Sequence, residues 1–159
     1  REHFPAERNF LAAHLTLFHQ LPEDAAADVP GTLAALADRT PAFPLVFEAP
    51  IPLGRGVAIR AAAPELPALR RRLAERFAPW LTPQDAGGFR PHVTVQNKVT
   101  PAAARALLAR LQASWRPLHG RAESLQLWRY AGGPWDAVDT YAFGGADARD
   151  AAPALPQDP

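Results

Sequence analysis

The chain has 159 residues, of which 48% are hydrophobic and 21% charged, and its formal net charge is +1. These values are typical of one soluble globular domain and exclude a polybasic coat for nucleic acid, so an anionic ligand would need a local site. The absence of cysteine excludes disulfides, thiolate metal ligands and a cysteine nucleophile, and we expect a cytoplasmic protein. No apolar run approaches the roughly 20 residues of a membrane-spanning helix.

The chain begins at Arg1 and contains no methionine, so we expect a segment upstream of this residue. Arginine greatly outnumbers lysine, and alanine and proline are abundant. This bias is typical of a GC-rich bacterial genome.

Hydrophobic patterns predict a strand, a helix and two further strands in the first part of the chain. Alternating apolar residues predict the first strand at 12–18, and the short helix at 31–39 ends before a proline. Two apolar, β-branched runs at 44–49 and 56–61 read as strands separated by a turn rich in proline and glycine.

The second part of the chain predicts the same kinds of element in a similar order. Apolar residues at steps of three and four predict an amphipathic helix within 64–81, and residues 82–89 read as a loop. A strand at 91–96 is followed by a helix at 101–113, for which Thr100 is the expected N-cap. Two closing strands are expected at 121–129 and 138–143.

The order of strand, helix, strand and strand therefore occurs twice. It predicts an α+β fold of two pseudo-symmetric lobes, each an antiparallel or mixed sheet with helices on its outer face, with a central cleft between them. We expect one bilobal domain at 1–145, divided into lobes of about 1–55 and 56–145, and a disordered tail at 146–159. The first lobe lacks the strand and helix that precede the key strand of the second, so roughly 20 residues are expected upstream.

A pair of histidine and threonine residues stands in each half of the repeat. "AHLTLF" contains His14 and Thr16, and "PHVTVQ" contains His92 and Thr94. Side chains two residues apart lie on the same face of a strand. Chance predicts roughly 0.2 His-x-Thr tripeptides in a chain of this composition, so two at equivalent points of a repeat indicate a functional site.

Two imidazoles that face one cleft can divide the work of phosphodiester chemistry. A neutral histidine removes a proton from the attacking water or hydroxyl, and a protonated one gives a proton to the leaving oxygen. The threonine hydroxyls can donate hydrogen bonds to the phosphate oxygens. Neither motif contains the carboxylates or additional histidines of a metal site, so no metal and no cofactor are expected.

"HLTL" and "HVTV" resemble the paired H-x-T-hydrophobic motifs of the 2H phosphoesterase superfamily, and their surroundings resemble its bacterial 2′-5′ RNA ligase-like branch. The resemblance extends roughly from residue 3 to 144. It implies two α+β lobes around a cleft and metal-independent opening of a cyclic phosphodiester, often a 2′,3′-cyclic phosphate. It also implies that His14 and His92 are the catalytic pair and that Thr16 and Thr94 bind the phosphate.

Several other residues have a functional and a structural interpretation. Gln96 and Lys98 share the parity of His92, so either can contact substrate if the strand extends that far, or else belong to a solvated strand end. His19 has the opposite parity to His14 and is interpreted as structural or surface, and His3 and His119 as surface residues.

Two further groups are also open to both interpretations. Four arginines of the helix within 64–81 are expected to form a solvated face, although such a row of positive charges can also contact an RNA backbone. Three aromatic residues near the end of the second half are expected mostly in the core, although one can stack on a base. The arginines are Arg70, Arg71, Arg72 and Arg76, and the aromatics are Trp128, Tyr130 and Trp135.

The sequence thus predicts a monomeric phosphodiesterase that opens a 2′,3′-cyclic phosphate on an RNA end or a small nucleotide. The reverse of this step would make the protein a 2′-5′ RNA ligase. The alternative is a non-catalytic module that uses the same cleft to bind RNA or phosphate. The sequence leaves open which histidine is the acid and which is the base.

Overall fold

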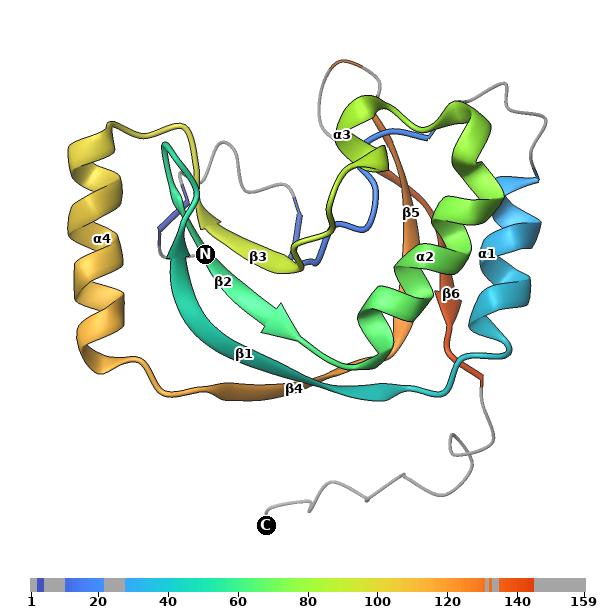
Figure 1. The fold of residues 1–159 in the computed structure, drawn as a ribbon, viewed down its shortest axis with the longest axis horizontal. Coiled ribbons are helices and arrows are strands. Elements are labelled where there is room, and N and C mark those ends of the chain that lie inside the picture. The colour runs from blue at the N-terminus through green and yellow to red at the C-terminus, as the bar shows by residue number, and fades with distance from the viewer. Residues whose placement is uncertain (1–2, 5–10, 22–27, 131, 133–134, 145–159) are drawn as a thin grey trace, which may run out of the picture.

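Two antiparallel sheets form the framework of the protein (Figure 1). The computed structural model describes residues 3–4, 11–21, 28–130, 132 and 135–144, and within them the α+β class is confirmed. The larger sheet has the strand order β3-β2-β1-β4, and the smaller one pairs β5 with β6. The strands are β1 (Phe43–Pro52), β2 (Val57–Ala62), β3 (His92–Gln96), β4 (Leu118–Ala122), β5 (Ser124–Tyr130) and β6 (Trp135–Ala142).

Each sheet is covered by its own helix. Helix α4 (Pro101–Ser114) packs against β1 and β2, and α1 (Val29–Ala37) packs against β5 and β6 at the opposite end of the molecule (Figure 1). Between them lie α2 (Glu65–Phe77), which continues into a 3₁₀ turn at Ala78–Trp80, and the short helix α3 (Pro83–Ala86).

Helices α1, α3 and α4 begin where a side chain satisfies one of their first free N–H groups, whereas α2 begins after Pro64 without such a cap. The Thr100 hydroxyl accepts a hydrogen bond from the Ala103 N–H at 3.2 Å, as the sequence predicts for the start of α4. The Asp28 carboxylate caps α1 by accepting from the Gly31 N–H at 2.9 Å.

The main core joins the small sheet to the helices beside it. Leu33 of α1, Leu73 and Phe77 of α2, Phe43 of β1 and Leu125 of β5 are all buried in one cluster. Strand β1 is long and has a bulge between Phe47 and Ala49. Its first half pairs with β4 and contributes to this core, and its second half pairs with β2. The β1–β2 hairpin also crosses the expected lobe boundary at residues 55 and 56.

Three expectations about secondary structure are wrong. The strand expected at 12–18 is absent, because residues 11–21 pair with no other strand in the described part of the chain. The strand expected at 121–129 is two strands of different sheets, since the chain passes from one sheet to the other at Glu123 without a glycine or proline to mark the break. The expected loop at 82–89 contains α3.

The predicted pseudo-symmetry of two lobes remains a prediction, because one sheet has four strands and the other two within the described residues. The predicted tail at 146–159 lies outside these residues. Among the helices that the structure describes, none is long and apolar enough to cross a bilayer.

Candidate active site

Strand pairing holds the second motif in place. His92 and Thr94 lie on β3, directly opposite Arg60 and Ala58 of β2 in the antiparallel ladder. Residues opposite each other in such a ladder share a face of the sheet, so the guanidinium-bearing Arg60 lies on the same face as the two motif side chains.

Glycine is required where β2 begins. A Cβ atom on Gly56 would lie 2.0 Å from the carbonyl oxygen of Gln96, at the end of β3. A larger residue at this position would therefore push apart the strands that fix the second motif.

The first motif lies on a segment without strand pairing. In residues 11–21, His14 is exposed and Thr16 is half-buried, while Leu15 and Leu17 pack against the main core. The adjacent Phe18 also packs against this core and Ala13 is exposed, so the segment does not keep the strict alternation of a strand, and no ladder in the described chain holds it.

Both motif histidines have the same hydrogen bond. Nδ1 of His14 lies 2.9 Å from the carbonyl oxygen of Ala12, and Nδ1 of His92 lies 2.7 Å from that of Arg90. Because a carbonyl oxygen can only accept, Nδ1 carries the hydrogen in each ring. Nε2 is then the nitrogen left to take up or release a proton.

A buried carboxylate fixes the residues that follow the first motif. Asp85 of α3 is only 2% exposed, and its carboxylate accepts hydrogen bonds from the backbone N–H groups of His19 and Gln20, both at 3.0 Å for the closer oxygen. Nδ1 of His19 also donates to this carboxylate at 2.9 Å, and the Thr82 hydroxyl lies 3.3 Å from it. The predicted structural role of His19 is consistent with these bonds.

A buried arginine makes contact with the same segment. Nε of Arg70 on α2 donates to the carbonyl oxygen of Leu17 at 2.7 Å, and its Cζ lies 3.6 Å above the centre of the Phe18 ring. Nη2 of Arg70 donates to the backbone oxygen of Asp85. The expected solvated face of α2 is therefore wrong for Arg70, which is 7% exposed, whereas Arg71, Arg72 and Arg76 are exposed.

The two charges stabilise each other inside the protein. Burial raises the pKa of the Asp85 carboxyl, but the hydrogen bonds from His19 and Gln20 outweigh it, so the pKa lies below its ordinary value. Burial lowers the pKa of the Arg70 guanidinium, and the negative charge of Asp85 opposes this change. An arginine pKa starts so high that the group remains protonated at neutral pH.

The other predicted site residues are Thr16 and Thr94 of the two motifs, and Gln96 and Lys98 at and beyond the end of β3. In the described part of the chain, the hydroxyls of Thr16 and Thr94 have no hydrogen-bond partner, and neither does the buried side-chain oxygen of Gln96. Lys98 lies outside the strand, which ends at Gln96, and has the left-handed φ of 59°. The alternation of the strand therefore does not place Lys98 on the face of His92.

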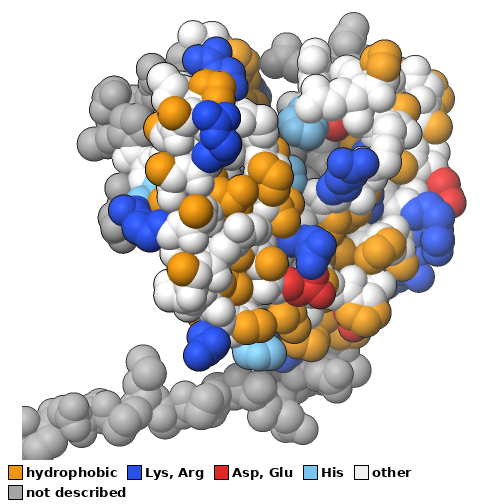
Figure 2. All heavy atoms as spheres, turned by 60° about the vertical axis from the view of Figure 1, so that its left-hand side comes forward, with side chains coloured by type: hydrophobic (Ala, Val, Ile, Leu, Met, Phe, Trp, Pro, Cys, Tyr) orange, Lys and Arg blue, Asp and Glu red, His pale blue; other side chains and the backbone are white. Residues whose placement is uncertain are grey.

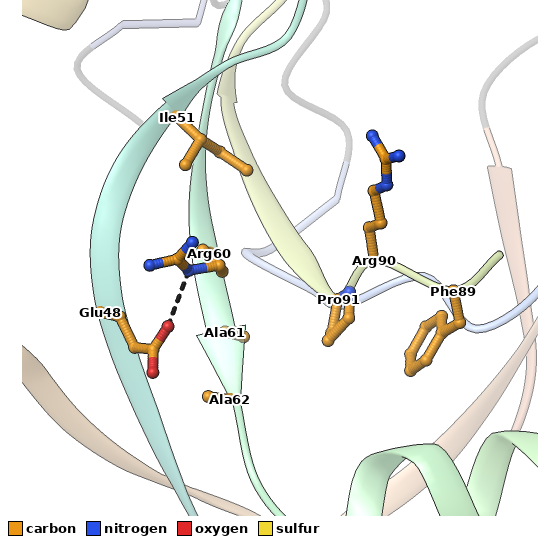
Figure 3. A pocket seen from close by; sticks show the side chains of 8 residues that line it. All are labelled: Glu48, Ile51, Arg60, Ala61, Ala62, Phe89, Arg90 and Pro91. Carbon is orange, nitrogen blue, oxygen red and sulfur yellow. Dashed lines mark hydrogen bonds and ion pairs between the residues drawn. The ribbon is translucent and has the colours of Figure 1, made fainter.

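A groove of about 420 Å³ lies beside the start of β3 (Figure 3). Apolar side chains line it, together with Arg90 and with Arg60, whose Nε donates to the Glu48 carboxylate at 2.7 Å. Neither motif histidine lines this groove. Figure 2 shows histidine side chains at a hollow in the surface, with cationic side chains nearby.

The aromatic residues near the end of the second half are less buried than expected. Tyr130 and Trp135 are 59% and 39% exposed, and their ring centres lie 4.9 Å apart. The expectation of core packing is therefore wrong for these two, while Trp128 is half-buried. Among the described residues, no three histidine, aspartate or glutamate side chains are arranged to hold a metal ion.

Three residues near the candidate site were not predicted from the sequence, although the pattern around each one sets it apart. Arg70 lies four residues after Leu66 and three before Leu73, on the apolar stripe of its helix. Asp85 stands three residues after Thr82, the spacing of a helix N-cap pair. Arg60 is the one charged residue of β2, and an alanine stands two residues before it and two residues after it.

Comparisons with known proteins agree with this fold. A crystal structure of TT0787 from Thermus thermophilus matches with a TM-score of 0.62 and 19% identity, covering 84% of this chain and 79% of that one. A crystal structure of Escherichia coli LigT complexed with 3′-AMP matches with a TM-score of 0.57 and 21% identity, covering 89% and 85%. No curated protein matches significantly.

The family model of the 2′-5′ RNA ligase superfamily matches residues 1–134. This match covers both His-x-Thr motifs, and the two structural neighbours share the fold of this chain. The chain therefore belongs to the 2′-5′ RNA ligase superfamily.

Proposed function

We propose that this protein is a metal-independent phosphodiesterase that opens a 2′,3′-cyclic phosphate on an RNA end or a nucleotide. The observation that supports the proposal most is the matched hydrogen bond of Nδ1 in His14 and His92, which leaves Nε2 of each ring for proton transfer. The 3′-AMP bound to the structural neighbour LigT is a nucleotide monophosphate, the class of molecule that such a ring opening produces.

The proposed step is a balanced displacement at phosphorus. Nε2 of one histidine takes a proton from water as the water oxygen bonds to phosphorus, and protonated Nε2 of the other gives a proton to the ribose oxygen as its bond to phosphorus breaks. The hydroxyls of Thr16 and Thr94 donate to the non-bridging oxygens, where negative charge grows in the transition state. The product is a phosphomonoester. If an RNA 5′-hydroxyl takes the place of water as the nucleophile, the same ring opening joins two RNA ends through a 2′-5′ phosphodiester, and the 3′ oxygen of the ribose leaves with the proton.

Gln96 and the two arginines nearest His92 are the proposed substrate contacts outside the catalytic set. Gln96 is partly exposed at the end of β3, where its side chain can hydrogen-bond a substrate, and Arg60 and Arg90 border the groove in Figure 3. Lys98 is exposed just beyond β3 and can contribute a further positive charge to an RNA backbone.

The test is hydrolysis of 2′,3′-cyclic nucleotides and of cyclic-ended oligoribonucleotides, with and without a chelator. We expect turnover that the chelator leaves unchanged and that His92→Ala lowers strongly. Loss of activity in the chelator would contradict the metal-independent mechanism. Nucleotide binding that His92→Ala weakens, without turnover by the unaltered protein, would instead favour the non-catalytic phosphate-binding module.

A further inference from the structure

Arg70 and Asp85 contact the first motif segment at every residue from Leu17 to Gln20. Arg70 bonds the carbonyl of Leu17 and stacks on the ring of Phe18, and Asp85 accepts from the N–H groups of His19 and Gln20. These four residues begin immediately after Thr16, so any movement of them carries the first motif with it.

The same pair is tied to the chain that leads into the second motif. Nη2 of Arg70 donates to the backbone of Asp85, and its Cζ lies 5.8 Å from the centre of the Phe89 ring. Phe89 precedes His92 by three residues and packs against the main core. A single guanidinium therefore lies between a ring four residues after His14 and a ring three residues before His92.

We propose that Arg70 and Asp85 are positioning residues, which set the first motif against the second through side-chain bonds to residues 17–20. This inference rests on the proposed function. Arg70 and Asp85 would hold the first motif in place, as the pairing of β3 with β2 holds the second. A lysine could not replace Arg70, because it has neither the flat guanidinium that covers Phe18 nor the separate nitrogens that reach the carbonyls of Leu17 and Asp85.

The test compares Arg70→Lys and Asp85→Asn with matched controls on the surface, Arg72→Lys and Asp136→Asn. We expect each buried variant to lower kcat on a cyclic nucleotide by about 10- to 100-fold with KM changed by less than about threefold, since a misplacement near 1 Å can cost this much. The controls should retain the kcat of the unaltered protein. Equal loss in controls and buried variants would overturn the proposal.

Placing Arg70→Lys in two further backgrounds separates positioning from a general loss of folded protein. Under single-turnover conditions at high enzyme concentration, the effect of Arg70→Lys should be much smaller in the His14→Ala background, where only Thr16 is left to be misplaced, and should persist in full in the His92→Ala background. The same fold-loss in both backgrounds would overturn the positioning role while leaving the proposed function intact.

Hydrogen exchange tests the inference without any turnover. Under native conditions, Arg70→Lys and Asp85→Asn should each speed the amide exchange of residues 11–21 by at least about tenfold and leave residues 92–96 unchanged. Unchanged exchange in residues 11–21 of both variants would contradict the inference. If the unaltered protein shows no phosphodiesterase activity, this result still decides whether the two charges hold the segment.

Discussion

The two His-x-Thr motifs have the same local chemistry but different structural support. His92 and Thr94 lie on a strand whose backbone is paired with β2, whereas His14 and Thr16 lie on a segment without strand pairing among the described residues. The bonds that fix this unpaired segment come from the side chains of Arg70 and Asp85. A ladder distributes its strength over many backbone bonds, so the first motif depends far more than the second on single side chains.

Removing either of the two histidines proposed to be catalytic should have the largest effect. His14→Ala and His92→Ala should each lower kcat by about 10²- to 10⁴-fold, because each would remove one proton transfer. His119→Ala is the control, since His119 is exposed on β4 at the other edge of the larger sheet. A steady-state assay in which only one of the two motif variants loses activity would show that the motifs do not form one site.

Truncating Asp85 should destabilise the protein by about 3 kcal/mol, because the N–H groups of His19 and Gln20 would be left without acceptors and Arg70 without its buried counter-charge. The free energy of unfolding of Asp85→Ala in urea measures this. Asp136→Ala, which alters an exposed aspartate, should change it by less than about 0.5 kcal/mol. An equally small change in the unfolding free energy of Asp85→Ala would show that Asp85 does not support the first motif segment.

The corresponding change for the second motif is Gly56→Ala. The added Cβ would overlap the carbonyl oxygen of Gln96, and relieving this overlap should cost about 1–3 kcal/mol of unfolding free energy. Hydrogen exchange should then accelerate in residues 92–96 and not in residues 11–21. Faster exchange in both segments would show that their supports are not separate.

The two threonines should matter less than the histidines and about equally. Thr16→Val and Thr94→Val keep the shape of the side chain but remove one hydrogen-bond donor to the phosphate, so we expect about a 10- to 100-fold loss in kcat for each. A loss confined to Thr94→Val would indicate that the first motif does not reach the phosphate.

Acid should weaken the support of the first motif. Because the pKa of Asp85 is lower in the folded than in the unfolded protein, its contribution is complete above the unfolded pKa, about 4, and is lost as pH falls through the folded pKa. His19 and Arg70 are the ionisable side chains that face Asp85. The difference in urea stability between the unaltered protein and Asp85→Asn should be constant from pH 7 to 5 and shrink below about pH 4.

Local signals in the sequence predicted much of this fold. The Thr100–Pro101 start of α4 and the strand at His92 follow from a few neighbouring residues, and the structure has both. The strand expected at 12–18 failed because a strand also needs a partner, which the pattern of one segment does not supply. The continuous pattern at 121–129 hid a change of sheet, since no glycine or proline stands at Glu123 where one strand ends and the next begins.

The candidate site was predictable only in its chemistry. The repeated spacing of histidine and threonine makes His14 and His92 the candidate catalytic pair, whereas the residues that hold the first motif are far away in the sequence. Arg70 lies 53 residues after Leu17, and Asp85 lies 66 residues after His19. One of four arginines on a helix becomes distinctive only when the fold shows that it is buried.

A crystal structure with a bound nucleotide monophosphate tests most directly whether the two differently supported motifs form one phosphate site. We expect Nε2 of His14 and Nε2 of His92 both to lie within hydrogen-bonding distance of the phosphate group, with the hydroxyls of Thr16 and Thr94 on its other oxygens. A phosphate bound by His92 and Thr94 alone, with His14 turned away, would contradict this expectation.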